Sequence, residues 1–217
     1  RSGPENLLLR ELPALLARFG RVEPVGQSFP VYKVGAVDVA LPRRESKTGR
    51  GHRGFTVEGD PFMSFADAAR RRDFTINTLA VRLQKKRFGE LIDFFGGLRD
   101  IKEKTIRVLH NLSFVEDPTR VLRAIRFEQR FDFRISKHTH NMIKTAVAMR
   151  LFDRLSGERI YTELVLMFAE SAPIKGLKRM KELDLLKFIH PSLTITPNTE
   201  KLFDGLSETL TWFRLLY

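Results

Sequence analysis

The spacing of apolar residues changes along the chain, and this change constrains the fold more than any other feature. In the second half, apolar residues recur every three or four positions in four successive segments, which is typical of helices that bury one face. These segments are Pro118–Arg130, Ser136–Ala148, Gly157–Glu170 and Ile174–Lys187. The sequence therefore predicts an all-helical part, residues 109–217, after a different kind of part, residues 1–108.

The first part mixes helical and strand signals and is predicted to be α+β. Helices are expected at Glu5–Phe19 and, after the capping residue Ser64, at Phe65–Arg71. Pro30–Val34 and Ala36–Leu41 are predicted to form a hairpin that turns at Gly35. Leu91–Phe95 is predicted to be a short strand, and the apolar segment Phe74–Leu83 suits either a helix or a strand.

Charge and composition narrow the choice of partner and compartment. Lys and Arg number 38 against 26 Asp and Glu, a net charge of +12. An excess of this size favours a polyanionic partner, either a nucleic acid or an anionic membrane surface. The 217 residues contain no cysteine, which excludes disulfides and cysteine-based metal sites and is compatible with the cytoplasm, where we expect the protein. No apolar run has the length of a membrane span. Of the two polyanionic partners we expect a nucleic acid and no membrane.

A cluster of cations lies in a glycine-containing stretch, Pro42–Phe55. This stretch has no apolar periodicity and is predicted to be a flexible, basic loop that contacts RNA. Its cations are Arg43, Arg44, Lys47, Arg50 and Arg53.

Two segments carry residue types that are common in binding and catalytic sites. The first is Arg70–Asn77, in which three consecutive arginines precede Asp73. Guanidinium groups suit phosphate oxygens, and the Asp73 carboxylate can accept a hydrogen bond from a ribose hydroxyl. The alternative is a solvated helix end, where cations offset the helix dipole.

The second such segment is Glu116–Phe127, the start of a predicted helix. Pro118 suits the first helical position, so Asp117 is the expected N-cap. Asp117, Arg120, Arg123 and Arg126 follow at steps of three and form a polar stripe. Arg120 is expected to pair with Asp117, and the pair could present an acceptor and donors to a nucleobase. The alternative is a capping aspartate paired with a helix arginine.

Five segments in one order resemble the motifs of the class II nucleotidyltransferase family, which includes CCA-adding enzymes and bacterial poly(A) polymerases. Arg71–Asn77 resembles the ribose and phosphate motif, and Glu116-Asp117 with Arg120 resembles the amino-acid template for the incoming base. Ile92–Ile101 resembles the neck motif, and Ser156–Glu163 resembles the motif of the following helix. Lys47–Phe55 resembles the mobile loop.

This resemblance implies a nucleotidyltransferase head of the polymerase beta type, followed by a helical neck and body. It implies Mg²⁺-dependent addition of C and A, from CTP and ATP, to the 3′ end of tRNA. Asp38 would be the catalytic, metal-binding carboxylate, although it could equally be a polar residue on an exposed hairpin face. The implied nucleotide-binding residues are Arg72, Asp73, Asn77, Asp117, Arg120, Arg123 and Arg126.

The chain departs from the family at one point. The family's Gly-Gly-x-Val-Arg-Asp strand and metal-binding Asp-x-Asp do not occur before Gly26. We therefore expect an N-terminally incomplete head, and a chain that has no nucleotidyl-transfer activity by itself. Poly(A) addition and a catalytically silent RNA-binding fragment are the alternative functions.

Overall fold

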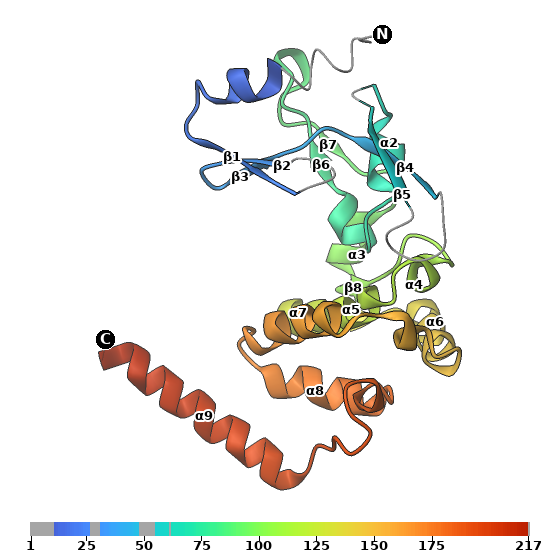
Figure 1. The fold of residues 1–217 in the computed structure, drawn as a ribbon, viewed down its shortest axis with the longest axis vertical. Helices are drawn as coiled ribbons and strands as arrows, with labels where there is room; N and C mark the ends of the chain where they lie inside the picture. Colours follow the sequence, from blue (N-terminus) through green and yellow to red (C-terminus); the bar gives the residue numbers. More distant parts are fainter. Residues whose placement is uncertain (1–10, 27–30, 48–54, 61, 217) are drawn as a thin grey trace. The chain divides into compact units, whose positions relative to one another are not determined.

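The computed structural model describes residues 11–26, 31–47, 55–60 and 62–216 (Figure 1). The chain divides into two compact units, Arg1–Arg71 and Arg72–Tyr217, and each is described by itself. Over these described ranges, the structure contains no helix that combines the length and apolar character needed to cross a membrane.

The first unit contains a three-stranded antiparallel sheet. Its strands are β1 (Val22–Val25), β2 (Val31–Val34) and β3 (Val37–Val39), in the order β1-β2-β3. The predicted hairpin is thus confirmed, with Gly35 at φ 58° in the turn, whereas β1 was not predicted. A short helix covers residues 11–16, and residues 5–10 of the predicted helix lie outside the described part.

A second pair of strands corrects the predicted basic loop. Arg43–Lys47 forms strand β4, which is antiparallel to β5 (Phe55–Gly59). The loop prediction is therefore wrong for residues 43–47 and for Phe55, because β4 carries no apolar alternation and is defined by backbone pairing with β5. Residues 48–54, with Arg50 and Arg53, lie outside the described residues. After β5, Ser64 caps α2 (Phe65–Ala69) as predicted, since its hydroxyl accepts from the Asp67 amide at 3.1 Å.

The second unit begins with short elements around one tight contact. The segment Phe74–Leu83 forms a 3₁₀ turn, η1 (Thr75–Thr78), and then β6 (Ala80–Val81), which pairs with β7 (Leu91–Ile92) across η2 (Lys85–Arg87). The predicted strand Leu91–Phe95 is thus a strand only at Leu91–Ile92, and a short turn leads from it to helix α3 (Gly97–Lys102), which lies against η1. A Cβ atom on Gly97 would stand 2.4 Å from the Thr75 carbonyl oxygen, so only glycine allows this approach.

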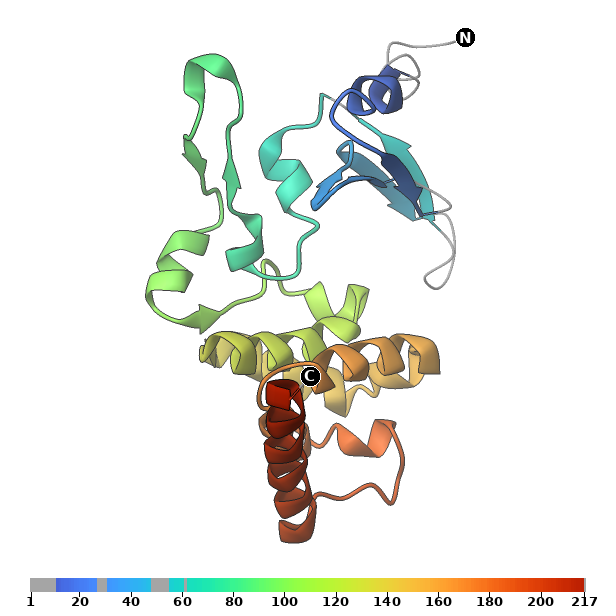
Figure 2. The same cartoon turned by 90° about the vertical axis from the view of Figure 1, so that its left-hand side faces the viewer.

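Helices make up most of the remaining chain, as predicted (Figure 2). In order they are α4 (Ser113–Glu116), α5 (Thr119–Phe131), α6 (Lys137–Ala148), η3 (Leu151–Arg154), α7 (Gly157–Phe168), α8 (Pro173–Glu182), η4 (Leu186–Phe188) and α9 (Pro197–Leu216). A parallel pair of short strands, β8 (Thr105–Ile106) and β9 (Arg134–Ile135), flanks α5. The predicted helix Ile174–Lys187 is wrong beyond Glu182, because Asp184 adopts the left-handed conformation, φ 57°, that ends a helix.

One hydrophobic core joins these elements. Val121 and Ile125 of α5 are fully buried, and Phe74 meets the Phe127 ring edge-on at 5.6 Å. Phe74 and Ile106 lie before residue 108 but belong to this same core. The compact unit therefore begins at Arg72, and the division into domains 1–108 and 109–217 stays a prediction.

Candidate functional site

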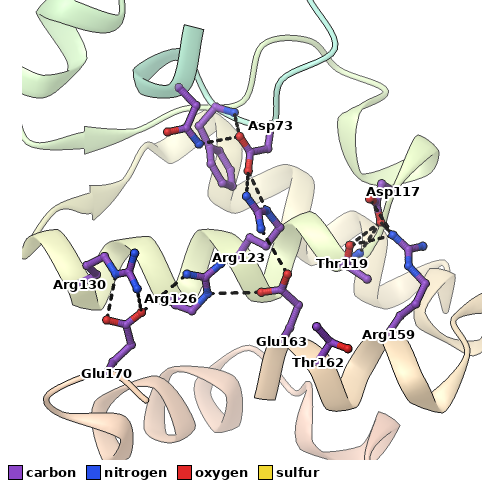
Figure 3. A network of polar contacts seen from close by, with 12 residues as sticks. Asp73, Asp117, Thr119, Arg123, Arg126, Arg130, Arg159, Thr162, Glu163 and Glu170 are labelled. Atoms are coloured by element: carbon purple, nitrogen blue, oxygen red, sulfur yellow. Dashed lines mark hydrogen bonds and ion pairs between the residues drawn. The ribbon is translucent and has the colours of Figure 1, made fainter. Parts of the chain in front are cut away.

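Asp73 and Arg123 join the two arginine-rich segments (Figure 3). The Asp73 carboxylate is largely buried and accepts from the Asn77 amide at 2.7 Å and from the Phe74 backbone N–H at 2.9 Å. Its other oxygen accepts from Arg123 Nε and Nη2 at 2.8 and 2.7 Å. Three predicted site residues thus come together, and Arg72, next in the chain, is exposed.

Arg123 is the first member of an ion-pair ladder between α5 and α7 (Figure 3). Glu163 of α7 lies 3.3 Å from Arg123 and 3.4 Å from Arg126. Glu170 then lies 3.7 Å from Arg126 and 2.7 Å from Arg130. Cations and carboxylates alternate along the ladder, so each charge faces an opposite charge.

Burial separates two residues of the predicted polar stripe. Arg126 is 4% exposed, and its guanidinium faces Glu163 of α7 and Glu170, two residues beyond the end of α7. Arg123 is more accessible and remains charged: burial lowers its pKa, but Asp73 and Glu163 raise it more, so the net shift is upward. Arg123 therefore positions Asp73, and Arg126 supports Arg123 through Glu163.

Asp117 lies at the start of α5, where it was expected. Its backbone is extended, with φ −145°, and Pro118 has helical dihedrals, φ −63°. The Asp117 carboxylate accepts from the Thr119 backbone N–H at 3.0 Å and from the Thr119 hydroxyl at 2.6 Å. The capping role of Asp117 is thereby confirmed.

The predicted pairing of Asp117 with Arg120 is wrong. Arg159 of α7 donates to both Asp117 oxygens at 2.9 Å. Arg120 instead donates to the Ser113 hydroxyl at 3.0 Å and lies 3.7 Å from Glu116. Side chains three residues apart face each other only when both residues lie within a helix. Asp117 has an extended backbone outside α5, so its carboxylate turns towards the first amides of the helix instead.

The contacts of Asp117 determine its protonation state. Burial raises the pKa of this carboxyl, but the Thr119 hydroxyl, the charge of Arg159 and the Thr119 amide together lower it below its ordinary value. An ionised, oriented carboxylate therefore lies beside the guanidinium of Arg159, and Arg120 follows in the first turn of the same helix, α5. This arrangement offers an acceptor and several donors, as recognition of a nucleobase edge requires.

Arg159 and Glu163 are the site residues that the sequence reasoning did not assign. Both fall in the motif Ser156–Glu163, but they had no role there. They lie four residues apart and therefore on one face of α7, the face that meets α5. The available signal was this spacing of four in α7 together with the arginines at steps of three in α5, the helix that α7 meets.

The predicted neck motif has a structural role. Asp93 accepts from the Gly97 and Leu98 amides at 2.9 and 3.0 Å. Slight burial raises the pKa of Asp93, but these bonds, with those from Phe95 and Gly96, lower it overall. Asp100 is fully buried, accepting from the Thr75 hydroxyl at 2.6 Å and from Arg107 Nε at 3.1 Å.

Asp38 and the basic strand belong to the first unit. Asp38 is exposed on β3 and lies opposite Lys33 in the strand register. Arg43, Arg44 and Lys47 lie on β4. Across the described residues, no three His, Asp or Glu side chains are grouped closely enough to hold a metal ion. One exposed carboxylate does not fit a two-metal centre by itself.

Comparison with known proteins places this geometry in a family. Residues 28–107 match the "Poly A polymerase head domain" family, and residues 132–196 match the "Probable RNA and SrmB-binding site of polymerase A" family. An A-adding tRNA nucleotidyltransferase of Geobacter sulfurreducens is 61% identical over 147 residues, covering 68% of this chain and 17% of the relative. The chain belongs to the poly A polymerase and tRNA nucleotidyltransferase family.

Two further relatives agree with this membership. A multifunctional CCA protein of Stenotrophomonas maltophilia is 38% identical over 175 residues, covering 78% of this chain and 42% of the relative. The solved Thermotoga maritima CCA-adding enzyme, complexed with tRNA, is 36% identical with a TM-score of 0.73 and covers 97% of this chain. The chain spans about half the length of that enzyme, or 47%. The likeness includes the fold that the sequence predicted, a nucleotidyltransferase head followed by a helical body.

Proposed function

We propose that the protein containing this chain adds nucleotides to the 3′ end of tRNA, with the base recognised at the start of α5. The main supporting observation is the Asp117 carboxylate at the start of α5, which Thr119 and Arg159 keep ionised, with Arg120 in the first turn of the same helix. Two fixed polar groups at a helix start can hydrogen-bond the edge of one base and reject another.

The remaining residues divide the work of holding a nucleoside triphosphate. Arg72 is exposed and is proposed to contact the phosphates, since a guanidinium matches phosphate oxygens. Asp73, which Asn77 and Arg123 hold in place, is proposed to face the ribose. The ladder from Arg123 to Glu170 fixes α5 against α7, so that the groups reading the base and the sugar keep their spacing.

Adenosine addition is the first candidate reaction. The Geobacter sulfurreducens relative, at 61% identity, carries an A-adding name. Addition of the complete CCA end is the second candidate, because the Stenotrophomonas maltophilia relative is a multifunctional CCA protein. ATP and tRNA are thus the proposed substrates, with CTP added in the second case.

Magnesium use stays part of the proposal, with Asp38 as one ligand. Divalent ions generally neutralise the phosphate charge that develops in nucleotidyl transfer. Because the described residues do not complete such a centre, the 217-residue chain alone is expected to bind nucleotide weakly and to show no turnover. A cytoplasmic location stays a prediction as well.

The test uses the full-length protein with tRNAs that lack the last nucleotide or the whole CCA end. Each tRNA is incubated with ATP or CTP alone, and product lengths are measured. Adenosine addition predicts extension only of the tRNA that ends in CC, and only with ATP. Extension of neither tRNA would favour the silent RNA-binding alternative.

An arginine variant tests the base-reading site. Arg120→Ala is expected to reduce kcat/KM for the correct nucleotide by about 5- to 150-fold, because a bidentate base contact is worth roughly 1–3 kcal/mol. Lys85→Ala, an exposed cation on η2, is the control and should leave the ATP-to-CTP preference unchanged. An unchanged preference in Arg120→Ala would contradict the proposed site.

A further inference from the structure

Two hollows in the second unit share one side chain, His138. The first is a hollow of about 420 Å³ beside β8 and β9, and the second is a hollow of about 180 Å³ between α4 and α6. We call them the basic hollow and the ring hollow. None of Asp73, Asp117 and Arg120 lines either one, so they are separate from the candidate nucleotide site.

The basic hollow is suited to an anion. Arg107, Arg134 and Lys137 line it, against the single carboxylate of Glu103. Arg107 is engaged by Asp100 at 3.1 Å. Arg134 and Lys137 are exposed, and their side chains have no hydrogen-bond or ion-pair partner in the described ranges. Two uncompensated cations in one concave surface attract a phosphate more strongly than either does alone.

The ring hollow is suited to a flat, largely apolar group. Phe114, Met142 and Leu151 supply apolar walls, and the amide side chains of Asn111 and Asn141 add polar groups. Its volume is below the roughly 300–1,000 Å³ of clefts that hold drug-sized ligands, which restricts the occupant to about one ring system. A nucleobase combines apolar faces with a polar edge in that way.

His138 lies where the two hollows meet. Its Nε2 is 2.9 Å from the Asn111 side-chain oxygen, and this contact fixes the exposed ring on the wall of the ring hollow. Histidine rings are among the side chains on which unstacked RNA bases stack. A phosphate on one side of His138 and a base on the other would belong to one nucleotide or to two neighbouring nucleotides.

We propose that the two hollows form a subsite for a single-stranded nucleotide of the RNA substrate, with the base in the ring hollow and the phosphate in the basic hollow. The proposal rests on the proposed function for its RNA. An apolar side chain of a protein partner could enter the ring hollow alone, but it would gain nothing from Arg134 and Lys137. The presence of the basic hollow next to the ring hollow therefore favours RNA over a protein partner.

Methionine methyl groups provide a local test. Met142 and Met149 line the ring hollow, whereas Met167 and Met180 are buried in the core. The 217-residue protein with ¹³C-methyl methionine is titrated with a short single-stranded RNA, and binding is measured in parallel by fluorescence anisotropy. We expect the Met142 and Met149 signals to shift and saturate with the anisotropy, while the Met167 and Met180 signals stay in place.

Charge variants test the basic hollow. Lys137→Ala should weaken RNA binding and reduce the slope of log affinity against log salt by roughly 1, as loss of one phosphate contact does. Lys144→Ala, an exposed lysine on α6 that lines neither hollow, is the matched control and should leave the slope unchanged.

Three outcomes would overturn the subsite. RNA binding without movement of the Met142 and Met149 signals would place the RNA elsewhere and leave the proposed function intact. Equal shifts with an apolar peptide that carries no phosphate, insensitive to Lys137→Ala, would identify a protein-binding pocket. Failure of the full-length protein to bind RNA or extend tRNA would remove the proposed function together with the subsite.

Discussion

Arg126 is a charged side chain that is almost fully enclosed by protein. Its guanidinium is stabilised by Glu163 at 3.4 Å and Glu170 at 3.7 Å. Removing a charge from water costs several kcal/mol, and opposite charges nearby offset that cost. Removing either carboxylate should therefore lower the free energy of unfolding, because the Arg126 charge would lose part of this compensation.

The Glu163→Ala variant should lose about 3–5 kcal/mol of unfolding free energy, because it leaves Arg126 buried with one distant partner. Urea unfolding of the 217-residue protein measures the loss. Asp153→Ala, which breaks an exposed pair with Arg150, is the control and should cost no more than about 1 kcal/mol. Equal costs for the two variants would show that the ladder contributes no more than a surface pair.

Asp117 gives the stability a specific pH dependence. The pKa of Asp117 in the folded protein is lowered from 3.8, whereas the pKa of an aspartate in the unfolded chain is about 3.9. The folded state therefore binds the proton less well, and the ionised carboxylate contributes its full stability above about pH 5. That contribution is lost as the pH falls through 3.8 towards the lower folded pKa.

The difference in unfolding free energy between the wild type and Asp117→Asn should consequently be constant from about pH 5 to 7 and shrink below about pH 4. Urea unfolding across this range measures it. Arg159→Ala should flatten the same profile, because the charge of Arg159 helps to lower the pKa. A difference that does not change with pH would mean that Asp117 titrates alike in the folded and unfolded chain.

Close approach of short elements decides the geometry near residue 73. Helix α3 lies against η1 because Gly97 has no side chain, and a Cβ there would meet the Thr75 carbonyl at 2.4 Å and Leu79 Cγ at 3.1 Å. Backbone atoms cannot move aside as the end of a flexible side chain can. The contact also brings Asp100 within reach of the Thr75 hydroxyl.

Gly97→Ala is expected to destabilise the second unit by about 1–3 kcal/mol, the range for overpacking in a well-packed interior. Gly157→Ala is the matched control at the start of α7, where nothing lies within 4 Å of the added methyl group. That control should be neutral or slightly stabilising, since alanine favours helix. Chemical unfolding that shows equal stability for the two variants would contradict the close approach.

The whole molecule carries a charge of +12, and this charge should control its affinity for RNA. Each phosphate neutralised by a lysine or arginine releases counterions, with a slope of about −0.7 per contact for single strands. We expect the logarithm of tRNA affinity to fall linearly with the logarithm of salt concentration, at a slope that corresponds to several contacts. Anisotropy titrations over a range of salt concentrations measure it, and a flat profile would exclude binding through the backbone phosphates.

Sequence alone determined the features that depend on neighbours within one element. Apolar spacing predicted α5, α6 and α7, Gly35 marked the hairpin turn, and the position of Pro118 identified Asp117 as a cap. These follow from local sterics and from periodicities of about 3.6 and 2 residues, which the chain displays in order. The motif order also indicated the family.

Only the tertiary structure decided which distant residues meet. Asp117 pairs with Arg159, 42 positions away, and not with Arg120, three positions away. Strand β4 exists because β5 pairs with its backbone, and Arg126 meets Glu163 and Glu170 because α7 and the residues just after it pack against α5. Spacing along a chain specifies which face of an element a side chain occupies, whereas packing of the elements selects the partner on that face.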